Sequence, residues 1–205
     1  MRQTLRAGAA IYNAGRYHAA HDAWEDRWLD LESGTDDERF LHGLIQFTAA
    51  VYHASDGNWA GATGLAESAT DYLAMLPADY RGVNLGPVRR YLETMAADPE
   101  VVERRRPLPL VHEGNEVRPK NLDLEATAVA APVIAEADGW DQGVVERAGE
   151  FARADVADGR AESPFATLLF DFVREPENRG IVMQRLSEHV GRRQDREADV
   201  DGLFE

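Results

Sequence analysis

Apolar residues recur every three to four positions through the first half of the chain, which is the spacing of the buried face of an α-helix. Glycine or proline interrupts this pattern at Gly15, Gly34, Gly57 and Pro77, and both residues commonly end helices. The pattern predicts helices over 2–13 and 17–32, a third from a capping box at Thr35 to Gly57, a fourth from Asn58 to Pro77, and a fifth that starts at Gly86-Pro87. The short loops between the first four favour antiparallel neighbours.

The helical spacing stops between residues 98 and 139, a segment that contains five prolines. Val111-His112 and Glu116-Val117 flank a turn-like Glu-Gly-Asn and are placed to pair as a short hairpin. Helical spacing resumes near Trp140 and continues to Gly191. The expected fold class is therefore all-α. An antiparallel bundle of about five helices occupies residues 1–98, a proline-rich connector 99–139, C-terminal helices 140–192 and a flexible charged tail 193–205.

Composition narrows the chemistry that is open to this chain of 205 residues. It has no cysteine, so only His, Asp, Glu and water remain as metal ligands. The formal net charge is −15, and Lys120 is the one lysine among 22 basic residues. We interpret this acidic, arginine-rich composition as halophilic adaptation, because concentrated salt screens the self-repulsion of the charge.

The same composition bears on partners and location. The acidic charge argues against nucleic acid as a partner, although the argument weakens for a protein that works in concentrated salt. No apolar run is long enough for a membrane span and no basic–apolar–small signal pattern is present, so we expect a cytoplasmic protein without a membrane partner. The expected partner is a small molecule or a protein of unknown identity.

Candidate chemistry concentrates in the second predicted helix. His18, His21 and Glu25 fall within an arc of about 60° around the helix axis. The aromatic residues Tyr17, Trp24 and Trp28 lie beside this polar strip and could exclude water from it. His21, Glu25 and Trp28 together spell His-x-x-x-Glu-x-x-Trp.

The third predicted helix carries a second polar strip, with His42, Gln46 and His53 beside Tyr52. If the two helices turn back on each other at Gly34, Gln46 faces Glu25, His53 meets His18 and His42 belongs with Trp28. His42 and His53 are about 16 Å apart along the axis and cannot share one ion. The predicted cluster is therefore His21, Glu25 and Gln46 with His18 and His53 one turn away, walled by Tyr17, Trp24, Trp28 and Tyr52.

Imidazole and carboxylate groups four residues apart suit a divalent metal such as Zn, Mn or Fe. A metal there predicts metal-assisted hydrolysis, with Glu25 as a ligand or as the catalytic general base. The same residues also have a purely structural interpretation, since a helical His–Glu pair can hold two helices together by hydrogen bonds. Both interpretations stay open from the residues alone.

At these residues the chain resembles domain-of-unknown-function family 309, small helical proteins defined by His-x-x-x-Glu-x-x-Trp. The resemblance covers about residues 8 to 80 and includes the run from Tyr12 to His18, then Gly43-Leu44-Ile45-Gln46, Tyr52-His53 and Gly57 to Ala62. It implies an all-α bundle and a suspected metal-binding role for His21 and Glu25. It implies no reaction.

A protein-interaction module is the alternative. The segments 14–20 and 56–62 resemble the Gly-x-Tyr-x-x-Ala turn between the helices of tetratricopeptide repeats. Their glycines, Gly15 and Gly57, are 42 residues apart, longer than the 34-residue repeat, and a third copy is missing from the sequence. A closed bundle is therefore favoured over a groove-binding array. In the alternative, the His21–Glu25 pair is purely structural and no metal is bound.

Overall fold

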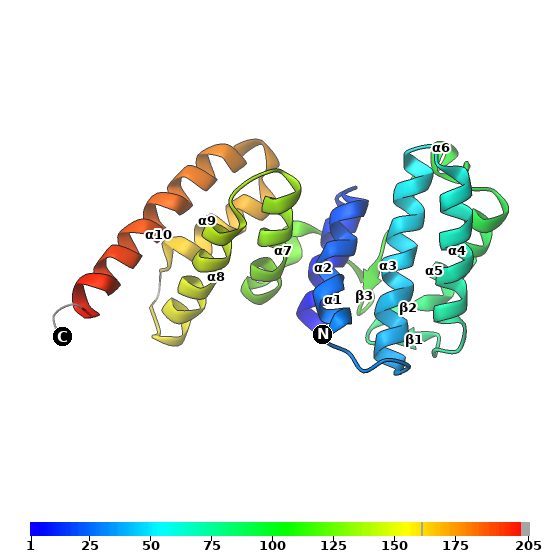
Figure 1. Cartoon of the computed structure of the whole chain (residues 1–205), viewed down its shortest axis with the longest axis horizontal. Coiled ribbons are helices and arrows are strands. Elements are labelled where there is room, and N and C mark those ends of the chain that lie inside the picture. Colours follow the sequence, from blue (N-terminus) through cyan, green and yellow to red (C-terminus); the bar gives the residue numbers. More distant parts are fainter. Residues whose placement is uncertain (161, 202–205) are drawn as a thin grey trace. The chain divides into compact units, whose positions relative to one another are not determined.

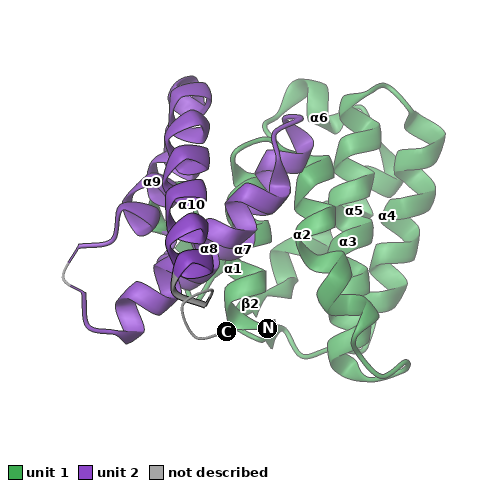
Figure 2. Cartoon of the chain, turned by 60° about the vertical axis from the view of Figure 1, so that its left-hand side comes forward, with its two compact units in different colours: residues 1–121 green, residues 122–205 purple. Residues whose placement is uncertain are grey.

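The computed structural model describes residues 1–160 and 162–201. The chain forms two compact units, Met1–Asn121 and Leu122–Glu205, which are coloured separately in Figure 2. The prediction of an all-α fold is confirmed, and the ten α-helices of the described part exceed the number that the sequence pattern indicated. None of the helices in this part combines the length and apolar character that a membrane span needs.

The first unit is a bundle in which consecutive helices pack side by side (Figure 1). Its helices are α1 (Arg2–Asn13), α2 (Tyr17–Leu29), α3 (Asp36–Ser55), α4 (Trp59–Ala74), α5 (Leu85–Ala97) and the four-residue α6 (Val101–Arg104). The predicted first helix agrees with α1, whereas α2 ends at Leu29 instead of residue 32. The side chains of Thr35 and Asn58 cap α3 and α4 as expected.

The turns after α1 and α3 have the same backbone geometry. Gly15 and Gly57 adopt φ values of 84° and 73°, a conformation that glycine reaches without a steric penalty. In each turn the amide of the following residue donates to a carbonyl five residues back, from Arg16 to Ile11 at 3.2 Å and from Asn58 to His53 at 2.9 Å. The sequence similarity of these two segments therefore reflects two equivalent helix–turn–helix pairs.

Close approach of α1 and α2 places Trp24 in the core. The Trp24 side chain is fully buried, and its indole N–H donates to the Thr4 carbonyl at 3.0 Å. A Cβ atom added at Gly8 would lie 2.2 Å from the indole ring, so α1 has no room for a larger residue there. This contact fixes which side of α2 faces the core and which side faces away.

The first unit also contains a small antiparallel sheet. Its strands lie in the order β1 (Asp79–Tyr80), β2 (Val83–Asn84), β3 (Val111–His112) and β4 (Asn115–Glu116). The hairpin suggested by the sequence is present as β3–β4, but its second strand is Asn115–Glu116 instead of the predicted Glu116-Val117. It pairs with a second hairpin, β1–β2, that the sequence pattern did not indicate. The buried side chain of Asn13 forms hydrogen bonds with the backbone of Leu110 and Val117, and these connect α1 to the β3–β4 hairpin.

The second unit contains α7 (Leu124–Ala137), α8 (Gln142–Ala157), α9 (Pro164–Arg174) and α10 (Arg179–Asp201). The prediction of a connector over 99–139 is wrong for residues 124–137, where α7 accommodates Pro132 and is capped by the Asp123 side chain. Proline disfavours a helix interior but does not forbid it when the surrounding face is buried. The predicted tail also differs, because α10 runs to Asp201; residues 202–205 lie outside the described part.

Candidate metal site on helix α2

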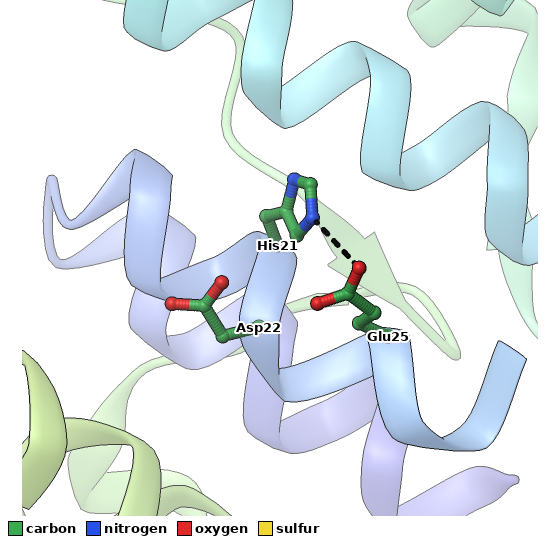
Figure 3. Close-up of side chains that lie close together, drawn as sticks. All are labelled: His21, Asp22 and Glu25. Atoms are coloured by element: carbon green, nitrogen blue, oxygen red, sulfur yellow. Dashed lines mark ion pairs between the residues drawn. The ribbon is translucent and has the colours of Figure 1, made fainter. Parts of the chain in front are cut away.

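The polar strip of α2 consists of His18, His21, Asp22 and Glu25. Within the described residues, His21, Asp22 and Glu25 are the one group of three or more His, Asp or Glu side chains whose possible ligand atoms lie within 4.8 Å of one another. His21 Nε2 lies 3.7 Å from Glu25 Oε1, across one helical turn (Figure 3). Residues four apart share a helix face, so the helix itself sets this separation.

His18 extends the strip by one turn. Its Nδ1 lies 3.4 Å from Asp22 Oδ2, and its ring stacks on that of His21 with 6.2 Å between centroids. Tyr52 of α3 meets His18 edge-on at 5.2 Å. The side chains of His21 and Glu25 keep 32% and 47% of their surface exposed, so an ion could reach them directly from solvent.

The predicted ligands from α3 have other partners. The amide nitrogen of Gln46 lies 3.2 Å from His42 Nε2, one turn back on the same helix. His53 Nδ1 lies 2.9 Å from the side-chain amide of Asn58, which caps α4. The structure thus brings together His21, Glu25 and Asp22, with His18 beside them, while Gln46 and His53 hydrogen-bond elsewhere.

A second polar group, which we name the Glu38 cluster, joins α2, α3 and α4. It consists of Trp28, Glu38, His42 and Tyr72. The Trp28 indole N–H donates to Glu38 Oε1 at 3.0 Å, and His42 Nδ1 lies 3.5 Å from the same oxygen. The His42 ring lies between Trp28 and Tyr72, with centroid distances of 4.5 and 3.9 Å. The third residue of the sequence motif, Trp28, therefore contacts α3 through Glu38 and His42.

Electrostatics in the Glu38 cluster favour the ionised carboxylate. Burial alone would raise the pKa of Glu38, but the hydrogen bonds from the Trp28 indole and the Gly34 amide, with the charge of His42, hold that pKa below its ordinary value. Glu38 Oε2 accepts the Gly34 amide at 3.3 Å. The capping-box glutamate therefore serves two purposes, closing the α2–α3 turn and anchoring Trp28.

The predicted aromatic wall is distributed over the bundle. Trp24 faces α1 in the core, and Trp28 belongs to the Glu38 cluster. The Tyr17 ring contacts Tyr12 at 5.1 Å, and burial raises the pKa of Tyr17 against an opposing influence of Arg106. Of these four aromatic residues, Tyr52 is the one with a ring contact to the polar strip.

Sequence reasoning missed Asp22 and Glu38. Asp22 lies four residues after His18 and three before Glu25, so the helical spacing that selected its neighbours could have included it. Glu38 is the glutamate of the capping box that starts at Thr35, and the capping pattern does not indicate that its carboxylate accepts from the Trp28 indole. Tyr72 comes from α4, and local spacing could not have indicated its contact with His42.

The donor set of the strip fits a divalent ion. Two ligands of one four-coordinate ion lie about 3.4 Å apart when each bond is about 2.1 Å. The His18–Asp22 and His21–Glu25 separations of 3.4 and 3.7 Å are close to this value. They are also longer than an ordinary hydrogen bond, so each pair could admit a bridging cation with little movement.

The part of the chain that contains the polar strip is similar to a known protein family. Residues 5–65 match the family described as Domain of unknown function (DUF309). We refer to residues 5–65 below as the DUF309 domain, after the family that they match. The predicted resemblance is thereby confirmed, and the DUF309 segment extends from α1 into the start of α4 and includes the whole polar strip.

One relative is an uncharacterised protein from Aquifex aeolicus (strain VF5). It is 27% identical over 99 residues, which are 48% of this chain and 29% of that protein. The matched region therefore spans less than a third of the relative's length. Neither the family description nor this relative names an activity.

Proposed function

We propose that the DUF309 domain binds a divalent metal ion, zinc, manganese or iron(II), through His21, Asp22 and Glu25. The observation that carries the proposal is the convergence of one imidazole and two carboxylates within 4.8 Å on one helix face. Imidazole nitrogen and carboxylate oxygen are donors that all three ions accept. His18 is placed to join the ligand set through its contact with Asp22.

The exposure of the strip supports an open site. Three protein donors leave at least one coordination position for water or a substrate, which is the arrangement of catalytic rather than structural zinc sites. A bound divalent ion would activate water for hydrolysis. Glu25 would then serve as a ligand or as the general base, and metal-assisted hydrolysis of a small molecule is the reaction class that we propose.

Metal content of the purified protein is the direct test. We expect about one equivalent of a divalent metal per chain by elemental analysis, and saturable rebinding of Zn²⁺ or Mn²⁺ after chelation. The double variant His21→Ala, Glu25→Gln should lose binding at least about tenfold while its circular dichroism stays unchanged.

Asp26→Asn is the matched control for Glu25→Gln, because it neutralises the next carboxylate along α2, outside the group of three. It should bind metal as the wild type does. An equal loss of metal affinity in Glu25→Gln and Asp26→Asn would mean that the negative charge of the surface, and not a specific site, attracts the ion. Protein that neither carries nor rebinds metal would overturn the proposal.

A protein-interaction module is the second candidate. Its support is the equivalence of the two helix–turn–helix pairs, α1–α2 and α3–α4, whose Gly15 and Gly57 turns share one hydrogen-bond pattern. Such a module would not depend on the ion. It predicts that the His21→Ala, Glu25→Gln variant retains its partner in a pull-down, whereas a metal-dependent function fails in that variant.

A further inference from the structure

The second unit contains a cavity that the polar strip does not explain. It is an open cavity of about 970 Å³, lined by residues from the end of α8, the start of α9, the loop between them and the middle of α10. This volume is at the upper end of the range for small-molecule pockets, roughly 300 to 1,000 Å³. Apolar side chains from Val156, Pro164, Leu168 and Phe170 form part of its lining.

Arg185 of α10 lines this cavity without a partner. Every other arginine in the described part of the second unit has a hydrogen bond or an ion pair, most of them to carboxylates. Arg185 has none among the described residues, although acidic residues outnumber basic ones by 37 to 22 in the chain. Arg185 is exposed to solvent, and an unpaired guanidinium beside an open, partly apolar cavity is suited to an anion from outside the chain.

A second guanidinium, that of Arg160, is held at the cavity by the buried Asp155 and by the exposed Asp158, whose Oδ2 lies 3.3 Å from Arg160 Nη2. Asp155 is 1% exposed, and its Oδ1 accepts from Arg160 at 2.7 Å and from Arg193 at 2.8 Å. Its Oδ2 accepts from the Ser163 hydroxyl at 2.8 Å. Burial would raise the pKa of Asp155, but its hydrogen bonds with Arg193 and Ser163 and the charge of Arg160 lower that pKa, so the carboxylate stays ionised. Arg160 is therefore positioned before any ligand arrives.

The charged groups around the cavity also limit how much negative charge a ligand can carry. Ser163 caps the eleven-residue α9, and the positive end of that helix dipole lies at the cavity. His189 adds an imidazole that packs edge-on against Phe165 at 6.1 Å. Glu162 and Glu188 line the same cavity, which disfavours a polyanion such as a nucleic acid. A single anionic group fits this balance better.

We propose that this cavity binds a small organic anion, with a carboxylate or phosphate group paired to Arg185 and Arg160 and an apolar body packed against Leu168 and Phe170. Guanidinium groups bind both anions in a bidentate fashion. The apolar lining supplies affinity for the rest of the molecule. This site is independent of the metal proposed for the DUF309 domain.

Titration of the whole protein with three matched probes tests the proposal by calorimetry or by NMR shifts. Phenyl phosphate and benzoate carry the anion on an apolar ring, and benzylamine carries a cation on the same ring. We expect saturable one-to-one binding of at least one anion, at least about tenfold tighter than benzylamine. The relative affinity of phenyl phosphate and benzoate identifies the preferred group.

The variant Arg185→Gln should weaken anion binding at least about tenfold. Arg196→Gln is the matched control, because it makes the same change on the same helix outside the cavity, and it should leave affinity within about twofold. Val156→Asp adds a test that keeps both arginines, and it should also weaken binding. Absence of saturable binding, benzylamine bound as tightly as the anions, or equal effects of Arg185→Gln and Arg196→Gln would each overturn the proposal.

Discussion

The polar strip on α2 and the Glu38 cluster use the same side-chain chemistry in opposite ways. Each pairs histidine with a carboxylate at four-residue spacing, His21 with Glu25 and Glu38 with His42. The side chains of Glu38 and His42 are 14% and 18% exposed, against 47% and 32% for Glu25 and His21. In the cluster, an indole and a backbone amide complete the hydrogen bonds of the carboxylate.

The difference teaches that residue spacing alone does not distinguish a site from a structural contact. Glu38 accepts from Trp28 of α2 and from the Gly34 amide in the α2–α3 turn, and it pairs with His42 of its own helix, so little acceptor capacity remains for a ligand. Glu25 lies on the exposed face and retains capacity for an ion. The comparison predicts two separate effects. Substitutions in the Glu38 cluster should lower stability, and substitutions in the polar strip should lower metal affinity.

The largest effect on stability is expected from Glu38→Gln. This change should lower the free energy of unfolding by about 1–3 kcal/mol, because the Gly34 amide and His42 lose a partly buried charged acceptor. Glu25→Gln, without metal, should change it by less than about 0.5 kcal/mol. Urea denaturation of the two variants measures both values. Equal stability losses would remove the distinction between cluster and strip.

A somewhat smaller effect should appear as coupling between Trp28 and Glu38. Trp28→Phe keeps an aromatic ring but removes the indole donor. In a double-mutant cycle with Glu38→Gln, we expect a coupling free energy of about 1 kcal/mol. The same cycle between Trp28→Phe and Glu25→Gln should give a value near zero. Additivity in the first cycle would contradict the role assigned to the indole.

The pH dependence of stability offers a third comparison. The pKa of Glu38 is lower in the folded protein than its ordinary 4.5, so the unfolded chain binds more protons near that pH. The contribution of Glu38 is therefore complete above the unfolded pKa and is lost as pH falls through the folded pKa. The stability difference between wild type and Glu38→Gln should be constant above about pH 6 and shrink below about pH 4.5.

His112 supplies a control for that window. Burial lowers the pKa of His112 below its ordinary 6.5, so the folded state resists protonation. Stability that depends on neutral His112 is complete above pH 6.5 and falls as pH drops towards the lowered pKa. This loss occurs in both wild type and Glu38→Gln and cancels in their difference. A difference that shrinks between pH 6.5 and 5.5 would therefore point away from Glu38.

The smallest effect is expected from the exposed end of the strip. His18→Ala, in metal-free protein, should change the free energy of unfolding by less than about 0.5 kcal/mol, because exposed ion pairs contribute little. With Zn²⁺ present, a contribution of His18 to the site should appear as weaker metal binding. Zinc titrations of His18→Ala and wild type at equal ionic strength measure it. Unchanged affinity would restrict the ligand group to His21, Asp22 and Glu25.

Much of the fold could be predicted because local signals set it. Gly15 and Gly57 end helices through a backbone conformation that glycine alone adopts easily, and Thr35 and Asn58 cap the helices that follow. The sequence pattern gave a wrong prediction where tertiary packing overrode a local conformational preference. Pro132 indicated a break, yet the buried face of α7 retains the helix around it.

For this protein, the amino-acid sequence by itself determined the all-α class, the DUF309 motif and the shared helix face of His21 and Glu25, because helical periodicity depends only on residues close in the chain. Tertiary structure decided that Gln46 and His53 hydrogen-bond elsewhere and that Trp28 anchors to Glu38. Rotation of one helix against another depends on packing from several helices, such as Trp24 against Gly8, and local spacing does not specify it.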